Sequence, residues 1–241
     1  IRFVFWVQWA FIIGILVPGH SQKRDIGSKA TPKMGHWFEC RDGSPLPIID
    51  LEATCWGSRH TPDGVSQSIH SMEIIEIGCA FANRQGELLD TQSFLVRPTR
   101  NPLLSTFYTG LTGITQPMVD SAPELPEAIE ATNSWLGDLP DDFIWCSWDN
   151  YDRLHLEAQS LLDGAQPAIL AYPHLNLKRI WRHTTGQKKK NGLASALQFH
   201  GLVFEGSHHR GVDDARNITR LLPFMKWSLE SELLTSPEGT V

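Results

Sequence analysis

The feature that most constrains the fold is a pair of acidic residues inside an apolar stretch. Residues 47–54 read PIIDLEAT and have the continuous apolar character of a buried central strand, interrupted by Asp50 and Glu52. Residues two apart in a strand point to the same face, roughly 6–7 Å apart along the backbone. Two carboxylates on one covered face repel each other, and their burial without a partner costs free energy. The pair therefore indicates a bound cation, while Leu51 and Ala53 point to the opposite face and are expected in the core.

The pattern of the remaining chain predicts an α/β domain. Three strands come first, and helices then alternate with further strands. The expected strands are Pro47–Thr54, Met72–Ala82, Leu88–Val96, Asp142–Trp148 and Leu175–Lys178. The expected longer helices are Leu125–Leu136, Asn150–Leu162, one through His183, Leu193–His200 and Val212–Leu229. This order predicts a ribonuclease H-like fold, with a mixed five-stranded sheet flanked by helices, over about residues 40–230.

Both ends of the chain are expected to lie outside this domain. Residues 1–18 are nearly all apolar and reach the lower length limit of a membrane span, whereas residues 19–33 are polar, as in a linker. We expect residues 1–33 not to be part of the fold; the alternatives are a membrane anchor or a signal peptide. We expect residues 231–241 to form a flexible tail. The expected location is the cytoplasm, or a membrane if residues 1–18 are an anchor.

Net charge and cysteine spacing limit how the chain could bind nucleic acid or metal. The formal net charge is −6, so the chain lacks the overall positive field of many nucleic-acid binders. Contacts with nucleic acid would have to come from local basic patches or from bound metal. The four cysteines include no C-x-x-C pair, which argues against a zinc site and favours free thiols.

Further acidic residues stand where other elements are expected to end or begin. Asp149 follows the fourth expected strand, and the carboxyl ends of strands are where α/β sheets build their sites. The segment 207–217 carries His208, His209, Asp213 and Asp214 at the start of the last helix. Taken alone, Asp149 and Asp213 are also suited to helix N-capping. Together, the acids supply hard oxygen ligands, which favour Mg²⁺ or Mn²⁺.

The order of these motifs resembles the DEDDh 3′–5′ exonucleases. The similarity extends from about Ile48 to Leu222, and it is most specific in LTGIT followed by VD, within residues 111–120. This middle block resembles the ERI-type family, which includes the histone-mRNA 3′-exonuclease and KapD-like proteins. The motifs imply four metal ligands and a catalytic histidine: Asp50, Glu52, Asp149, Asp214 and His209. Glu52 would also take part in catalysis, and the family spacing selects His209 over His208 and Asp214 over Asp213.

The resemblance implies a metal-dependent 3′–5′ exonuclease. Two Mg²⁺ or Mn²⁺ ions would promote hydrolysis, with His209 as general base, and release nucleoside 5′-monophosphates from single-stranded 3′ ends. RNA is the favoured substrate and DNA the alternative. A different class of function also stays open: a non-catalytic regulator that uses the exonuclease fold to bind a partner. No membrane partner is required, and the sequence identifies no protein partner.

Substrate contacts are expected from aromatic and basic residues. The resemblance implies that Phe107 and Trp148 stack on the terminal bases, the alternative being that both are core aromatics. Ala53 and Thr54, next to the acid pair, are also expected to contact the substrate. Three lysines at 188–190, with Arg179 and Arg182 nearby, could bind phosphates or form a solvated charged surface.

Overall fold

A computed structural model describes residues 45–188 and 191–235 of the chain. The predictions for residues 1–33, including the apolar segment, fall outside the described residues. Within the described ranges, no helix combines the length and the apolar character needed to cross a membrane.

The sheet is mixed and has six strands in the order β3-β2-β1-β4-β5-β6. The strands β1 (Leu46–Ala53), β2 (Ile74–Ala82) and β3 (Leu88–Leu95) form an antiparallel meander. The short strands β4 (Trp145–Ser147) and β5 (His174–Asn176) continue the sheet parallel to β1. The predicted ribonuclease H-like α/β fold with a mixed sheet is confirmed, and the strand count is six instead of five.

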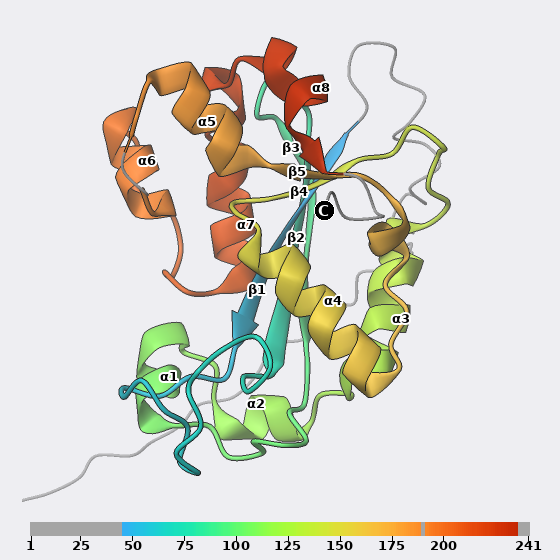
Figure 1. Ribbon diagram of the computed structural model, residues 1–241, viewed down its shortest axis with the longest axis vertical. Helices are drawn as coiled ribbons and strands as arrows, with labels where there is room; N and C mark the ends of the chain where they lie inside the picture. Colours follow the sequence, from blue (N-terminus) through green and yellow to red (C-terminus); the bar gives the residue numbers. More distant parts are fainter. Residues whose placement is uncertain (1–44, 189–190, 236–241) are drawn as a thin grey trace, which may run out of the picture. The chain divides into compact units, whose positions relative to one another are not determined.

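Helices cover both faces of the sheet (Figure 1). The helices are α1 (Thr106–Thr112), α2 (Gln116–Asp120), α3 (Leu125–Leu136), α4 (Tyr151–Asp163), α5 (Leu177–Thr185), α6 (Leu193–Phe199), α7 (Gly211–Thr219) and α8 (Glu230–Leu233). Alternation along β1 sends Ile48 into a core shared with α5, α6 and α7, and Ile49 and Leu51 into a core shared with α3 and α4. Asp50 and Glu52 therefore face the side of the sheet on which α7 packs.

The end of the chain differs from the prediction. The last long helix was expected to run to Leu229, but α7 ends at Thr219, and 3₁₀ turns follow around Pro223, which cannot continue the helical hydrogen bonding. Residues 231–235 were expected in a flexible tail. They form the end of α8 and the two-residue strand β6 (Leu234–Thr235), because Leu233 is buried and β6 pairs with β5. Residues 236–241 lie outside the described part.

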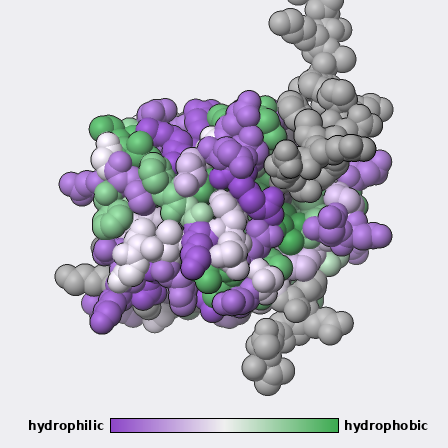
Figure 2. Space-filling model, turned by 90° about the horizontal axis from the view of Figure 1, so that it is seen from above, coloured by the Kyte–Doolittle hydropathy of each residue, from purple (hydrophilic) through white to green (hydrophobic). Residues whose placement is uncertain are grey.

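The surface is mainly polar on the face shown in Figure 2. Apolar residues form separate small groups among hydrophilic ones there. This agrees with the burial of most large apolar side chains in the two cores between the sheet and the helices.

Candidate active site

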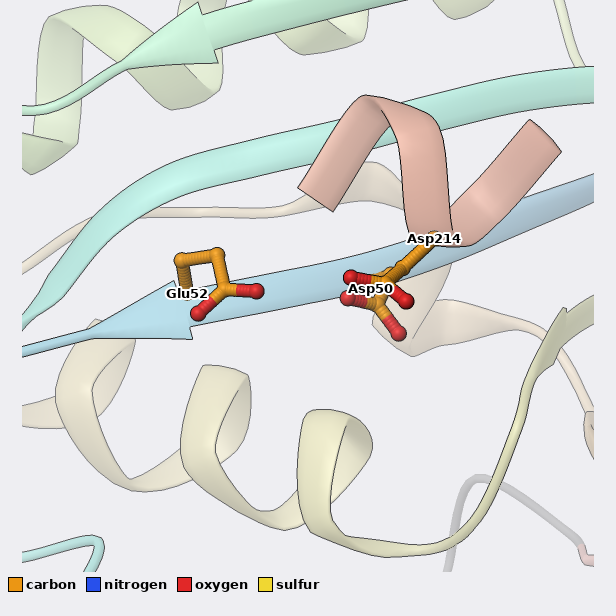
Figure 3. A group of neighbouring side chains, drawn as sticks. All are labelled: Asp50, Glu52 and Asp214. Atoms are coloured by element: carbon orange, nitrogen blue, oxygen red, sulfur yellow. The ribbon is translucent and has the colours of Figure 1, made fainter. Parts of the chain in front are cut away.

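Three carboxylates converge where α7 crosses the sheet (Figure 3). Asp50 and Glu52 come from β1 and Asp214 from the first turn of α7. One oxygen of each lies within 4.8 Å of the others, and each residue is partly buried. The sequence-predicted acid pair and the predicted last ligand are thus brought together, as a metal site requires.

Two glycines allow α7 to approach the strands closely enough to form this group. A Cβ atom on Gly78 of β2 would lie 1.9 Å from the carbonyl carbon of Gly211, the first residue of α7. A Cβ atom on Gly211 would lie 2.8 Å from the carbonyl oxygen of Asp50. Because neither residue has a side chain, the N-terminus of α7 rests directly on β1 and β2, and Asp214 lies over Asp50.

The electrostatics of the group favour a bound cation. Burial, followed by the charge of Asp214, raises the pKa of Glu52 to about 8. Burial also raises the pKa of Asp214 to about 7 and holds that of Asp50 well above its ordinary value. Three acids that resist ionisation at neutral pH through desolvation and mutual repulsion are suited to a hard divalent ion, which would remove the cost of ionising them. The donor set fits Mg²⁺ or Mn²⁺.

His209 stands in a turn that is tied to Asp214. Its backbone has φ of 62°, a left-handed conformation that is uncommon for residues other than glycine, and its N–H donates to Asp214 Oδ2 at 2.9 Å. Burial, and then the charge of His208, lower the pKa of His209. The imidazole of His208 instead stacks on Phe204, with ring centroids 3.7 Å apart. Of the two histidines, His209 is the one that lines the cavity over the acids.

Glu76 holds the turn that contains His209 in place on β2. This residue was not identified from the sequence. Glu76 lies fully buried on β2, opposite Glu52 in the strand register. Its carboxylate pairs with the Arg210 guanidinium at 3.1 Å and accepts the Gly211 N–H at 3.0 Å. These contacts fix the residues on the C-terminal side of His209. The available signal was an acid at a fully buried position of a strand that is otherwise apolar.

An open cavity of about 300 Å³ lies over the acid group. Its lining residues are Asp50, Leu51, Glu52, Trp148, Asp149, Tyr151, Asp152, Leu193, His209 and Asp214. The cavity therefore joins the acids to the end of β4 and the start of α4.

Asp149, the remaining predicted ligand, lies on the cavity wall but outside the three-acid group. Its side chain is 41% exposed, and its carboxylate accepts the Tyr151 N–H at 2.7 Å and pairs with Lys178 Nζ at 3.2 Å. The N-capping role that the sequence left open is thus partly present, because this carboxylate binds the first N–H of α4.

Asp152 is a second acid that sequence reasoning missed. It lies buried in the first turn of α4, and its Oδ1 accepts the Leu51 N–H at 3.1 Å, between the two acids of β1. Among neighbouring charges, Asp152 has the largest effect in raising the pKa of Asp50, and its own pKa is raised to about 7 by burial. The sequence offered one indication of this role: Asp152 stands about one helical turn after Asp149, in the helix expected to follow it.

The four residues expected to contact substrate lie in different surroundings. Trp148 is nearly buried, lines the cavity, and its indole N–H has no hydrogen-bond acceptor within the described part of the chain. Phe107 is 49% exposed, on α1 beside Gly57. Ala53 and Thr54 are buried, and the Thr54 hydroxyl accepts the Glu73 N–H at 2.9 Å. Trp148 is therefore the one of the four that lines the cavity.

Comparison with known proteins places this geometry in a family. The family model described as Exonuclease matches residues 48–222, a span that includes the acid group, the cavity and α7. The chain belongs to the ERI-type DEDDh 3′–5′ exonuclease family. "ERI1 exoribonuclease 3" of Homo sapiens is 32% identical over 184 residues, which cover 73% of this chain and 51% of that protein. "ERI1 exoribonuclease 2" of Xenopus laevis is 29% identical over 237 residues, covering 89% of this chain and 32% of that protein.

Solved structures agree with this exonuclease assignment. The nuclease domain of 3′hExo, described as a DEDDh family member bound to rAMP, is 27% identical with a TM-score of 0.65. The match covers 75% of this chain and 90% of that domain. A full-length 3′-exonuclease is 25% identical with a TM-score of 0.67, over 80% of this chain and 85% of that one. The chain spans about half the length of the ERI1 exoribonuclease 3 proteins it matches, whereas the similarity covers most of the nuclease domain.

Proposed function

We propose that this chain is a divalent-metal-dependent 3′–5′ exonuclease that acts on single-stranded 3′ ends, with RNA favoured over DNA. The observation that carries the proposal is the group of three carboxylates beneath a cavity whose wall includes His209. The names of the ERI1 exoribonucleases support RNA as substrate. The rAMP bound to the nuclease domain of 3′hExo supports nucleoside 5′-monophosphates as products.

The carboxylates would hold two Mg²⁺ or Mn²⁺ ions. Asp50, Glu52 and Asp214 would provide three of the ligands, and we favour Asp152 over Asp149 as the fourth. Asp152 is buried beside the acid pair, where its Oδ1 accepts the Leu51 N–H, and it lines the cavity, whereas Asp149 is partly exposed and pairs with Lys178. The bound ions would neutralise these acids and stabilise the charge that develops on the phosphate during hydrolysis.

The protein's own groups position the reactants around this centre. His209 would accept the proton of the attacking water, and its orientation would be maintained by the Asp214 and Glu76 contacts of its turn. Trp148 at the cavity wall would contact the terminal nucleotide, and Phe107 on α1 would stack on a base at the exposed surface.

Product analysis tests this function directly. RNA and DNA oligonucleotides of matched sequence would be incubated with the protein and Mg²⁺ or Mn²⁺, and the products separated by chromatography. We expect nucleoside 5′-monophosphates, formed faster from RNA. Nucleoside 3′-monophosphates, internal cleavage, or partner binding without any hydrolysis would contradict the proposal, and the last result would favour a non-catalytic regulator.

A further inference from the structure

A second cavity, of about 390 Å³, lies along α5 and the segment that follows it. Its lining residues are Arg179, Arg182, His183, Gly186, Gln187 and Lys188. None of the described acidic side chains forms an ion pair with any of the three cations that line it. In a chain with a net charge of −6, this cluster of basic side chains is a local positive surface.

Helix stabilisation does not account for all of these charges. A cation near a helix C-terminus interacts favourably with the helix dipole and so stabilises the helix. This accounts for Arg182 and His183 in the last turn of α5. Arg179, however, lies in the first turn of α5, which carries no acidic residue and where a cation opposes the dipole. Lys178 in the same turn pairs with Asp149, whereas Arg179 is exposed and has no such partner among the described residues.

Arg182 gives this cavity a defined shape. Its Nε donates to the Gln187 carbonyl at 3.3 Å and its Nη2 to the Lys188 carbonyl at 3.0 Å. The segment after α5 is thus folded back onto the helix, and Lys188 is held on the same side as Arg179. Two exposed cations then flank a cavity whose wall is fixed by a third.

The position of α5 connects this cavity to the candidate active site. The helix begins beside the active-site wall, where Lys178 contacts Asp149, and its nine residues span about 13 Å. At ~3.4 Å per phosphate in a stacked strand, this length corresponds to about four nucleotides. The cavity follows this length, from Arg179 in the first turn of α5, next to Lys178, to Lys188 beyond the last turn. A strand whose 3′ end occupied the acid group could therefore pass Arg179 first and extend along α5 toward Lys188.

We infer that this basic cavity binds the phosphodiester backbone of the substrate strand, upstream of the nucleotide that is cleaved. The inference rests on the proposed exonuclease function. Arg179 and Lys188 are the contacting residues, because both are exposed and have no ion-pair partner within the described ranges, and a guanidinium is well suited to a phosphate. Arg182 instead maintains the shape of the cavity.

Substrate length separates this site from the active site. The double variant Arg179→Gln/Lys188→Gln would be compared with wild type on a trinucleotide and on a single-stranded RNA of about twelve nucleotides. We expect kcat/KM to fall by about tenfold on the long RNA and by less than about threefold on the trinucleotide, which is too short to reach Lys188. Equal losses on both substrates, or no loss on the long RNA, would overturn the inference.

Salt dependence of binding provides a second readout that needs no hydrolysis. In an Asp50→Asn background, the affinity for the long RNA would be measured by fluorescence anisotropy at several salt concentrations. Loss of two phosphate contacts should reduce the slope of log K against log salt by about 1.4. If the slope falls but kcat/KM is unchanged on both substrates, the cavity contacts RNA only outside the productive complex and the inference is wrong.

A matched control addresses the change in net charge. Arg97→Gln removes one positive charge from an exposed pair with Glu124, and it should leave kcat/KM on both RNAs unchanged, whereas Lys188→Gln alone should lower only the long-RNA value. An equal effect of the two single variants would show a nonspecific charge effect. If wild type hydrolyses neither RNA, the proposed function has failed, and the salt slope still decides whether the cavity binds the strand.

Discussion

At the scale of single residues, the acids near the cavity divide into a close group and two candidates for its fourth member. Asp152 is buried and interacts with Asp50, whereas Asp149 is partly exposed and pairs with Lys178. Replacement by asparagine keeps the size of each side chain while removing its charge. The two acids can therefore be compared with matched variants.

We predict that Asp152→Asn reduces kcat/KM by at least about a hundredfold and weakens Mn²⁺ binding, because it removes a charge beside Asp50. Asp149→Asn should retain activity within about tenfold, since its carboxylate contacts Lys178 and the Tyr151 N–H and lies outside the three-acid group. Steady-state kinetics together with Mn²⁺ titration would measure both effects. The reverse ranking would restore Asp149 as the fourth ligand.

The two adjacent histidines allow an equally direct comparison. His209 lines the cavity, whereas His208 stacks on Phe204. His209→Ala should lower kcat by about 10²–10⁴-fold, the usual contribution of a general base, with little change in KM. His208→Ala should lose less than about tenfold. If His208→Ala were the inactive variant, the assignment of the general base would be wrong.

At the scale of elements, the placement of α7 on the sheet creates the site. The Gly78–Gly211 contact leaves no space for a side chain, and the contact brings Asp214 from one end of the chain to β1 near the other. The stability of α7 docking and the ability to bind metal are therefore linked.

We predict that Gly78→Ala destabilises the protein by about 1–3 kcal/mol or more and abolishes Mn²⁺ binding, because the new methyl group would displace α7. The control is Gly110→Ala in α1, where a Cβ atom meets nothing within 4 Å. That change should be neutral or stabilise by up to about 1 kcal/mol through helix propensity. Thermal unfolding and metal titration would test the pair, and normal Mn²⁺ binding by Gly78→Ala would contradict the linkage.

How much the sequence reveals also depends on the element. The strands β1, β2 and β3 were predictable because their apolar runs are long, and Asp50 and Glu52 followed from alternation in β1. The strand β6 was not, because two residues carry no periodic pattern. Asp152 was missed because its role depends on the packing of α4 against β1, and Glu76 because its partners Arg210 and Gly211 are 134 and 135 residues away in the chain.

At the scale of the whole molecule, the stability of the metal-free protein should depend on pH through the acid group. The folded-state pKa values of Glu52 and Asp214 are raised to about 8 and about 7, above unfolded values of about 4. Protonation then favours the folded state. Stability from this group is fully present below about pH 4 and is progressively lost as the pH rises toward about 8.

Comparison with Asp50→Asn isolates this contribution. In EDTA, the Tm of Asp50→Asn minus that of wild type should increase between about pH 5.5 and about pH 8, because the variant has one repelling charge fewer. Buried His155 and His174, whose pKa values are lowered by burial, are present in both proteins, so their effects cancel. Saturating Mn²⁺ should reverse the difference by stabilising wild type. A difference that does not vary with pH would show that the acids do not repel in the folded protein.

The described part of the protein has two regions of opposite charge that could contact one nucleic-acid strand: the acid group and the basic cavity. The acid group requires a cation before a phosphate can approach, whereas the basic cavity along α5 attracts phosphates without metal. An overall acidic protein can in this way bind a polyanion through local sites.

The central claim is that the acid group cleaves the RNA strand from its 3′ end.

The most direct measurement follows a 5′-labelled single-stranded RNA on a sequencing gel, with either a free or a blocked 3′ hydroxyl. The account predicts a ladder that shortens progressively from the 3′ end with Mg²⁺ or Mn²⁺, no reaction in EDTA, and none with Asp50→Asn. The blocked RNA should persist. Metal-independent cleavage, full activity of Asp50→Asn, or equal degradation of the blocked RNA would contradict the account.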